Sequence, residues 1–427
     1  MNLFYPNSDK NKFGYYEVGD YRTYSKYDAI LAAKQSGLKV NWNFNDEVYS
    51  SQNWSIEPDK SLDELYRLRA EQIREKYDYI VLLFSGGADS HNVLMTFVNN
   101  NIHLDEVLTH HTLKGDNGDQ DSFRNLEVFR SAVPIGKQLA EKYNIKHRVV
   151  DNTDLIMNFQ KDHRESKFDY VYYGNFSSSI NSVARSDLKF YIEDYRKLIE
   201  KGKRVCFIHP TDKPCLTFDN GKWWANFFDV TDHSVPANQQ MYNRDDDHDE
   251  FFYWSPECPE IVIKQCHVLK NYLSNKSVTD NLLNHPKVNK WNFEYSNSHV
   301  VYQGIRLLNE QIKYVIYSTW SSDIFSNEKS PTGYLFTMVD SWFYKTNTKQ
   351  SKIYADNVAK AFQDLGHHWF WWHDINNTNI GHHKKIFSDI IYPNGHQFKK
   401  IIRRTEDGKY QFPSFFKSIY TRPYFLN

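Results

Sequence analysis

The stretch YIVLLF at residues 79–84 runs without a break into SGGADS at residues 85–90. Its first half is short, apolar and rich in β-formers, which predicts a buried strand of a parallel sheet. In HNVLMTFV, residues 91–98, apolar residues recur at helical spacing and predict a helix that begins near Ser90. Glycines between the two elements permit a tight turn and let a ligand approach the backbone. The unbonded N–H groups and positive dipole end of the helix then favour an anion, most often phosphate.

The sequence of the glycine loop excludes two common classes of nucleotide-binding site. It lacks the Gly-Lys-Ser/Thr of a Walker A motif and the Gly-x-Gly-x-x-Gly of a dinucleotide fingerprint. Ser-Gly-Gly-x-Asp-Ser instead resembles the signature of the PP-loop ATP pyrophosphatases. That superfamily includes the synthetase domain of asparagine synthetase, queuosine synthase, tRNA-thiolating enzymes, NAD synthetase and phosphoadenosine phosphosulfate (PAPS) reductase. The alternative is a plain diglycine turn followed by helix-capping residues.

The resemblance implies that ATP binds with Mg²⁺ and is cut between its α and β phosphates. It assigns roles to the six loop positions. Asp89 helps to hold Mg²⁺ and is a candidate catalytic residue. The expected ATP-binding set is Ser85, Gly86, Gly87, Ala88, Asp89 and Ser90, in which the serines and glycines cradle the β and γ phosphates.

Bulk composition indicates a folded protein and does not point to a nucleic-acid partner. The 427 residues carry a formal net charge of −1, with 16% aromatic and 25% charged residues, so a small-molecule or nucleotide-derived substrate fits the charge as well. The sequence contains no apolar run of about 18 residues, so no membrane-spanning helix is expected. Four cysteines in so long a chain, with no signal-peptide pattern at the start, favour a cytoplasmic location.

Strand and helix patterns alternate from residue 78 onward and predict an α/β fold. The expected fold is a doubly wound, mostly parallel sheet of the HUP-like PP-loop kind, with helices on both faces. Strands are expected at 79–84, 104–111, 146–150 and 204–208, and helices at 122–143 and 184–201. The strand order 3-2-1-4, taken from the superfamily, places the ligand between the first and fourth strands, beyond their carboxyl ends.

A second loop, His209 to Pro214, follows the fourth predicted strand and would face the glycine loop. Its Lys213 is the second candidate catalytic residue, because a cation there can neutralise charge on leaving pyrophosphate. Asp212 is expected to join the nucleotide-binding set by similarity to the loop that the superfamily carries at this place. Since Asp and Pro also favour turns, a plain turn is the alternative.

Three regions are expected: an N-terminal extension at 1–76, a PP-loop domain at 77–235, and a mixed α+β region at 236–427 that faces the substrate. In the extension, Ser61 and Glu64 form a capping box that opens a helix over 60–76. Further along, Asn220-Gly221 predicts a hairpin turn. Additional helices are expected at 259–273 and 352–364.

Several other clusters carry weaker signals. The acidic run at 245–250 is interpreted as a solvated loop rather than a cation site. Cys258 lies in Glu-Cys-Pro-Glu, a departure from the Glu-Cys-Gly of PAPS reductases, and its acidic neighbours favour a structural thiol. The His- and Trp-rich stretch at 367–383 is read as core or pocket wall, and the basic run at 399–404 as a solvated face. Candidate substrate contacts at the sheet edge are Arg124, Asn125, Glu127, Arg185 and Lys189.

Together these patterns predict an ATP-dependent enzyme that adenylates a substrate and releases pyrophosphate. A nucleophile then displaces AMP, so the expected partner is an amine or sulfur donor. Asn2 follows Met1 and the segment before the loop is short, so no built-in glutaminase is expected. Two alternatives stay open: a PAPS-reductase-like oxidoreductase and a nucleotide-binding protein without chemistry.

Overall fold

The computed structural model describes the fold over most of the first 320 residues and a short C-terminal part. The described residues are 14–23, 26–111, 113–114, 118–121, 125, 127–154, 192–210, 213–229, 248–285, 300–307, 309–320, 403–404, 410–411 and 419–426. Among the helices of these ranges, none is both long enough and apolar enough to cross a membrane.

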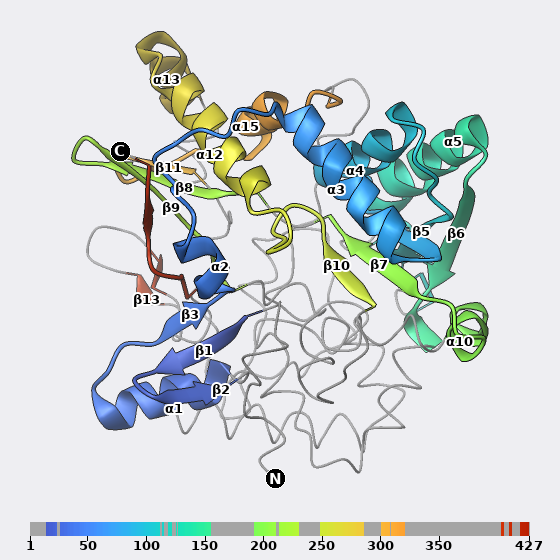
Figure 1. The fold of residues 1–427 in the computed structure, drawn as a ribbon, viewed down its shortest axis with the longest axis horizontal. Coiled ribbons are helices and arrows are strands. Elements are labelled where there is room, and N and C mark those ends of the chain that lie inside the picture. The colour runs from blue at the N-terminus through green and yellow to red at the C-terminus, as the bar shows by residue number, and fades with distance from the viewer. Residues whose placement is uncertain are drawn as a thin grey trace.

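A five-stranded parallel sheet, termed the central sheet, lies on the right in Figure 1. Its strands lie in the order β10-β7-β4-β5-β6. Their bounds are β4 Tyr79–Leu83, β5 Glu106–His111, β6 Lys146–Asp151, β7 Val205–His209 and β10 Asp249–Phe251. Every neighbouring pair runs parallel, so the predicted α/β class and the 3-2-1-4 order are confirmed, with β10 added as a fifth strand beside β7.

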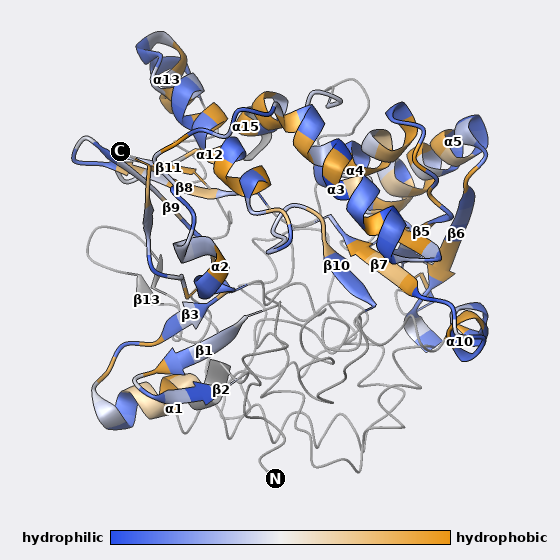
Figure 2. Cartoon of the chain, viewed as in Figure 1, coloured by the Kyte–Doolittle hydropathy of each residue, from blue (hydrophilic) through white to orange (hydrophobic). Residues whose placement is uncertain are grey.

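Helices cover both faces of this sheet, which confirms the doubly wound arrangement. Alternate residues of β4 point to opposite faces, since successive side chains of a strand alternate. Ile80 and Leu82 join the core under α3 (Leu62–Lys76) and α4 (Ala88–Asn99), whereas Val81 packs with Tyr195 of α10 (Glu193–Glu200). The first four residues of β7 are correspondingly apolar, and most of this strand is orange in Figure 2.

Two predicted helices have other bounds in the structure. The helix expected at 122–143 is a π-helical turn, η1 (Val128–Ala132), that continues as α5 (Val133–Tyr143). Of the helix expected at 184–201, the described part is α10, which begins after Ile192. The expected helix at 352–364 lies outside the described residues.

Local signals elsewhere are confirmed. Ser61 and Glu64 form the predicted capping box at the start of α3. β8 (Cys215–Asp219) and β9 (Lys222–Asn226) form the predicted hairpin, and both turn residues, Asn220 and Gly221, have positive φ as a type I′ turn requires. The helix expected at 259–273 is α12 (Glu260–Leu273).

Two further sheets lie to one side of the central sheet, on the left in Figure 1. The hairpin belongs to a second five-stranded sheet, ordered β12-β11-β8-β9-β15, and the N-terminal strands form a third, ordered β2-β1-β3. The remaining bounds are β1 Tyr15–Val18, β2 Tyr21–Thr23, β3 Asn41–Asn43, β11 Val300–Tyr302, β12 Ile305–Arg306, β13 Arg403–Arg404, β14 Tyr410–Gln411, β15 Tyr424–Phe425, α1 Lys26–Ser36, α2 Asp46–Ser50, α13 Lys276–Leu283 and α15 Asn309–Ile316.

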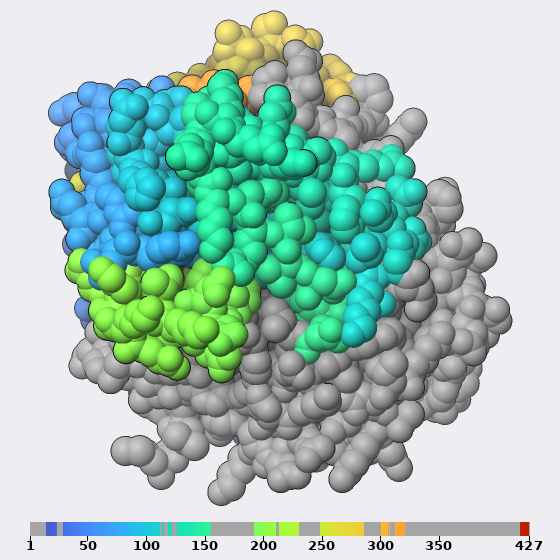
Figure 3. All heavy atoms as spheres, turned by 90° about the vertical axis from the view of Figure 1, so that its right-hand side faces the viewer, coloured from blue at the N-terminus to red at the C-terminus, as the bar shows by residue number. Residues whose placement is uncertain are grey.

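Residues far apart in the sequence share one core. In Figure 3 the segment of β7 and α10 lies against residues of the first 150, so that they form one continuous surface. The main core contains Phe44 from the N-terminal part, Leu82 from the central sheet and Trp254 from beyond residue 235. Since β10 also lies beyond 235, the central sheet includes a strand from the region expected to be separate. The division at 76 and 235 stays a prediction.

The sequence analysis interpreted the acidic run at 245–250 as a solvated loop, and this interpretation is wrong for its last two residues. Asp249 and Glu250 lie in β10 and are buried. Buried Glu250 accepts hydrogen bonds from Arg69 at 2.7 Å and from Tyr77 at 2.7 Å. Burying a charge is costly unless it is paired, and these partners from α3 and the residue after it supply the pairing. The first three residues of the run lie outside the described ranges.

Candidate functional site

The glycine loop connects β4 to α4 at the carboxyl edge of the sheet. The main-chain nitrogen of Phe84 bonds to the oxygen of Leu108 at 2.8 Å, which extends the β4–β5 ladder by one residue. Gly86 then takes φ +73°, and a Cβ there would lie 2.7 Å from the backbone of Ala132 in η1. Both the left-handed backbone and the close contact require glycine. The turn therefore packs against the π-helical segment.

Helix α4 begins two residues earlier than the sequence predicted. Gly87 is its N-cap in an extended conformation, with no side-chain cap, and the helix starts at Ala88 rather than near Ser90. Ala88, Asp89 and Ser90 thus form the first turn, where main-chain N–H groups lack intrahelical acceptors and the helix dipole is positive. This geometry suits an anion beside the loop.

The two serines of the loop contact each other across the turn. Their hydroxyl oxygens are 3.4 Å apart, and the Ser90 hydroxyl donates to the main-chain oxygen of Gly87 at 3.1 Å. Ser85 is exposed, whereas Ser90 is buried. Of the two serines, Ser85 is therefore the one with an accessible side chain, and Ser90 holds the turn in shape.

Lys213 lies beside the glycine loop. Its position after the fourth predicted strand, which is β7, suggested this. Its Nζ lies 2.8 Å from Oδ2 of Asp89. The lysine side chain is only 6% exposed and the aspartate 22%, so the ammonium is largely buried and the carboxylate remains in contact with solvent. The structure brings together the two predicted catalytic residues across 124 positions of sequence. Asp212 lies outside the described residues.

Asp89 has a second partner that the sequence did not suggest. The hydroxyl of Tyr317, directly after α15, donates to Oδ1 of Asp89 at 2.5 Å. Burial raises the pKa of Tyr317 well above its usual value, and the negative charge of Asp89 raises it further. The phenol therefore stays protonated and acts as a donor.

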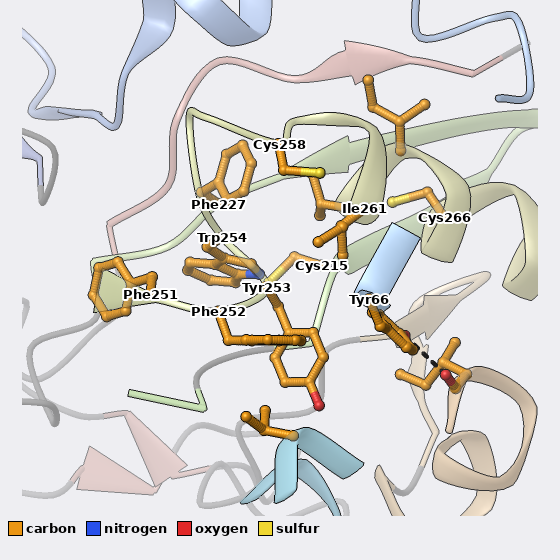
Figure 4. Close-up of a cluster of buried hydrophobic side chains, with 14 of the residues drawn as sticks. Tyr66, Cys215, Phe227, Phe251, Phe252, Tyr253, Trp254, Cys258, Ile261 and Cys266 are labelled. Carbon is orange, nitrogen blue, oxygen red and sulfur yellow. Dashed lines mark hydrogen bonds between the residues drawn. The ribbon is translucent and has the colours of Figure 1, made fainter. Parts of the chain in front are cut away.

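A further tyrosine supports the same helical turn. The Tyr253 hydroxyl donates to the main-chain oxygen of Asp89 at 2.9 Å and accepts from Nδ2 of Asn92 at 3.1 Å. Thr319 donates to the other amide atom of Asn92 at 3.0 Å. Figure 4 shows the Tyr253 ring next to that of Phe252, with its hydroxyl directed away from the apolar cluster. Residues after 250 thus hold the first two turns of α4.

His91, next in α4, contributes no charge to the site. Its side chain is buried, and burial lowers the pKa of the imidazole to about 4. At neutral pH it is uncharged. The positive charge beside Asp89 comes instead from Lys213.

Another pair missed by the sequence analysis lies at the end of β7. Nε2 of His209 is 2.7 Å from Oδ1 of Asp249 in β10. His209 is the last residue of β7, and Asp249 is fully buried. The only sequence signal was the position of His209 at a strand end, because Asp249 was hidden in an acidic run.

The described residues fit a magnesium ion only in combination with a ligand. Within them, no group of three or more His, Cys, Asp or Glu is placed to hold a metal ion. Mg²⁺ is commonly bound by one or two carboxylates together with substrate phosphates and water. Asp89, a partly exposed carboxylate next to a loop with the geometry for phosphate, matches that pattern.

The weaker sequence candidates have different outcomes. Asn125 is buried, and its Nδ2 donates to the main-chain oxygen of Asp119 at 3.0 Å, which is a structural contact. Glu127 precedes η1 as its N-cap residue. Lying outside the described residues are Arg124, Arg185, Lys189, the stretch 367–383 and residues 399–402.

Cys258 is a buried thiol, as its sequence context suggested. It lies among Phe227, Trp254 and Ile261 in the aromatic cluster of Figure 4. Burial raises the pKa of the thiol to about 11, and the negative charge of Glu260 adds to the effect. A reactive thiol needs a lowered pKa and access to solvent, so this environment is that of a structural cysteine.

No protein-family model matches the chain, and no curated protein matches it. Among solved structures it is similar to the NH3-dependent NAD synthetase of Campylobacter jejuni, at 17% identity and a TM-score of 0.25, over 36% of this chain and 58% of that one. It is also similar to the NMN synthetase of Francisella tularensis, at 16% identity and a TM-score of 0.24, over 36% of this chain and 56% of that one. The chain thus spans between half and two thirds of the length of these two proteins.

Proposed function

We propose that this protein is an ATP-dependent adenylating enzyme of the PP-loop class. One observation carries the proposal: Lys213 and Asp89 meet at 2.8 Å beside the Ser-Gly-Gly-x-Asp-Ser turn, at the carboxyl edge of a parallel sheet. Open α/β sheets bind ligands at this edge, where the strand order reverses. In this sheet the reversal lies at β4: the chain continues from β4 to β5 and β6 on one side, and later adds β7 and β10 on the other side.

The loop and the first turn of α4 would bind the β and γ phosphates of ATP. Main-chain N–H groups supply hydrogen bonds there, and the helix dipole favours the negative charge. Ser85 adds a hydroxyl donor. Mg²⁺, held by Asp89 and the phosphates, would neutralise part of the triphosphate charge when bound.

Lys213 would act on the leaving group. An oxygen of the substrate attacks the α-phosphorus, the bond from that phosphorus to the bridging oxygen breaks, and pyrophosphate leaves with the electron pair. The Lys213 ammonium stabilises the charge that develops on pyrophosphate. Asp89 holds that ammonium at the loop. A nitrogen or sulfur nucleophile then displaces AMP from the adenylated atom and gives up its proton to solvent.

The acceptor would be a small-molecule or nucleotide-derived compound, and the nucleophile ammonia, an amine or a sulfur donor. The buried Cys258 argues against the PAPS-reductase-like alternative, since a redox step requires an accessible thiolate. The other alternative, a nucleotide-binding protein that catalyses no reaction, has to be excluded by experiment.

Two measurements test this function. Calorimetric titration with ATP and Mg²⁺ should show binding. Phosphorus NMR of ATP incubated with a panel of carboxylates, ureides and nucleosides, with ammonia present, should show AMP and pyrophosphate. ADP and phosphate would overturn the proposed cleavage site. Absence of binding heat would overturn the nucleotide site, and binding without cleavage across the panel would favour a non-catalytic protein.

A further inference from the structure

Tyr317 makes the longest-range contact described at the loop. It follows α15 and lies 228 positions from Asp89, yet its hydroxyl is 2.5 Å from Oδ1 of that residue. The whole tyrosine side chain is buried. The loop carboxylate therefore depends on a residue from the C-terminal half of the chain.

The position of Tyr317 is fixed by its neighbours. Its main-chain nitrogen bonds to the oxygen of Lys313 at 2.9 Å. The preceding residue, Ile316, accepts a hydrogen bond at 2.8 Å from the hydroxyl of Tyr66 in α3. The Tyr317 ring packs against that of Tyr253, with centroids 5.3 Å apart. A side chain held in this way loses little further freedom when it orients another group.

We infer that Tyr317 is a positioning residue for the Asp89 carboxylate, which it holds in the orientation that receives a magnesium–triphosphate complex. This inference rests on the proposed function. Tyr317 engages one carboxylate oxygen and Lys213 the other, so the two donors together fix the rotation of the group. Carboxylates that bind metals are commonly held by such outer hydrogen bonds.

The inference also gives the C-terminal half a role at the site. Tyr253 supports the main chain of Asp89, and Tyr317 supports its side chain. Both come from the part of the chain beyond residue 235. The metal affinity of the loop would thereby depend on whether α15 is in place.

The test replaces one hydroxyl and measures metal binding directly. Electron paramagnetic resonance should detect Mn²⁺ binding to the wild-type protein in the presence of ATP. Tyr317→Phe, which keeps the ring, should weaken that binding about tenfold, the usual loss for an outer-shell partner of a metal ligand. The Mg²⁺ concentration for half-maximal pyrophosphate release should rise in parallel.

A matched control separates this effect from general loosening of the core. Tyr195 is also buried and also donates to a carboxylate, Glu106, at 2.6 Å, but at the amino end of the sheet. Tyr195→Phe should leave Mn²⁺ binding unchanged. If both phenylalanine variants weaken Mn²⁺ binding equally, or if Tyr317→Phe binds like the wild type, the inference is wrong.

A double variant guards against misfolding and keeps the two proposals distinct. With Asp89→Asn in place, Tyr317→Phe should cause no further loss of Mn²⁺ binding, because the two residues act through one carboxylate. Additive losses would contradict the inference. If the wild-type protein binds no Mn²⁺ with ATP, the proposed function itself fails, which is a different result from an unaffected Tyr317→Phe.

Discussion

Two carboxylates at opposite edges of the central sheet have similar partners but different surroundings. Asp89, at the carboxyl edge, is bonded by Tyr317 and Lys213 and is 22% exposed. Glu106, at the amino edge, accepts at 2.5 to 2.9 Å from four donors and is fully buried; these donors are Tyr79, Lys146, Arg148 and Tyr195. A carboxylate has about four acceptor positions, so Glu106 is saturated.

The difference supports a structural role for Glu106 and the proposed functional role for Asp89. Glu106 joins the first residues of three neighbouring strands and the helix that covers them, and no ligand can reach it. Asp89 adjoins the glycine loop, in which Ser85 is exposed, and keeps solvent contact. The type of partner alone would not distinguish them, whereas exposure and position on the sheet do. The following experiments test this distinction.

The largest effect is expected from removing the lysine at each carboxylate. Lys213→Met should lower pyrophosphate release about a hundredfold or more, because it removes the cation that we propose stabilises the leaving group. Lys146→Met, the same change beside Glu106, should leave turnover unchanged. Steady-state rates of pyrophosphate release measure both. Equal losses in the two variants would show that the edges of the sheet do not differ in role.

For the free energy of unfolding, the larger effect is expected from changing Glu106 rather than Asp89. Glu106→Gln should lower the free energy of unfolding by about 3 kcal/mol, since it leaves Arg148 and its neighbours without their buried counter-charge. Asp89→Asn should also destabilise the fold, because it leaves the largely buried Lys213 without this carboxylate, but by less, since Asp89 is 22% exposed whereas Glu106 is fully buried. Urea titration followed by circular dichroism measures both changes. A larger loss in Asp89→Asn would contradict the assignment of Glu106 as the structural carboxylate.

Acid pH offers a second test of Glu106. Burial would raise the pKa of Glu106, but hydrogen bonds led by those from Tyr195 and Arg148 outweigh it and hold the pKa below its usual value. A depressed pKa stabilises the fold above the unfolded pKa of about 4.3, and this contribution is lost as pH falls through the lower folded value. The stability gap between wild type and Glu106→Gln should therefore narrow on acidification. A gap that widens would show that the pKa is not depressed.

Sequence signals predicted the elements that local chemistry defines. The glycine loop, the capping box at Ser61 and the Asn220-Gly221 hairpin are each set by a few adjacent residues, and each is confirmed. The strand order followed from the family resemblance. The approach of Lys213 to the loop then followed from parallel strands ending at one edge.

Partners brought together from distant positions could not be predicted. Strand β10 was missed because Asp249 and Glu250 look solvated until His209 and Arg69 are seen beside them. Tyr317 carries no signal of its own, since a tyrosine after a helix is ordinary. Its proposed role depends on the packing of α15 against α3 and α12, which no spacing in the sequence reveals.

Glycine variants test whether the loop turn is as constrained as its contact with η1 implies. Gly86→Ala should cost about 2 kcal/mol more than Gly221→Ala, because both have positive φ but only Gly86 meets a backbone 2.7 Å from the added Cβ. Urea unfolding measures the difference, and Gly221 in the hairpin serves as the control for φ alone. Similar costs would mean that η1 moves aside easily and does not fix the loop.

The smallest effect is expected at a residue near neither carboxylate. Cys258→Ser should leave pyrophosphate release unchanged, because the thiol is buried among aromatic rings and its pKa of about 11 keeps it protonated. Thiol reagents at neutral pH should label it only after unfolding, as with the other three cysteines, which are also buried. Rapid labelling of Cys258 in the folded protein, together with loss of activity in the serine variant, would instead support the oxidoreductase alternative. It would move the chemistry from the edge of the central sheet to the start of α12.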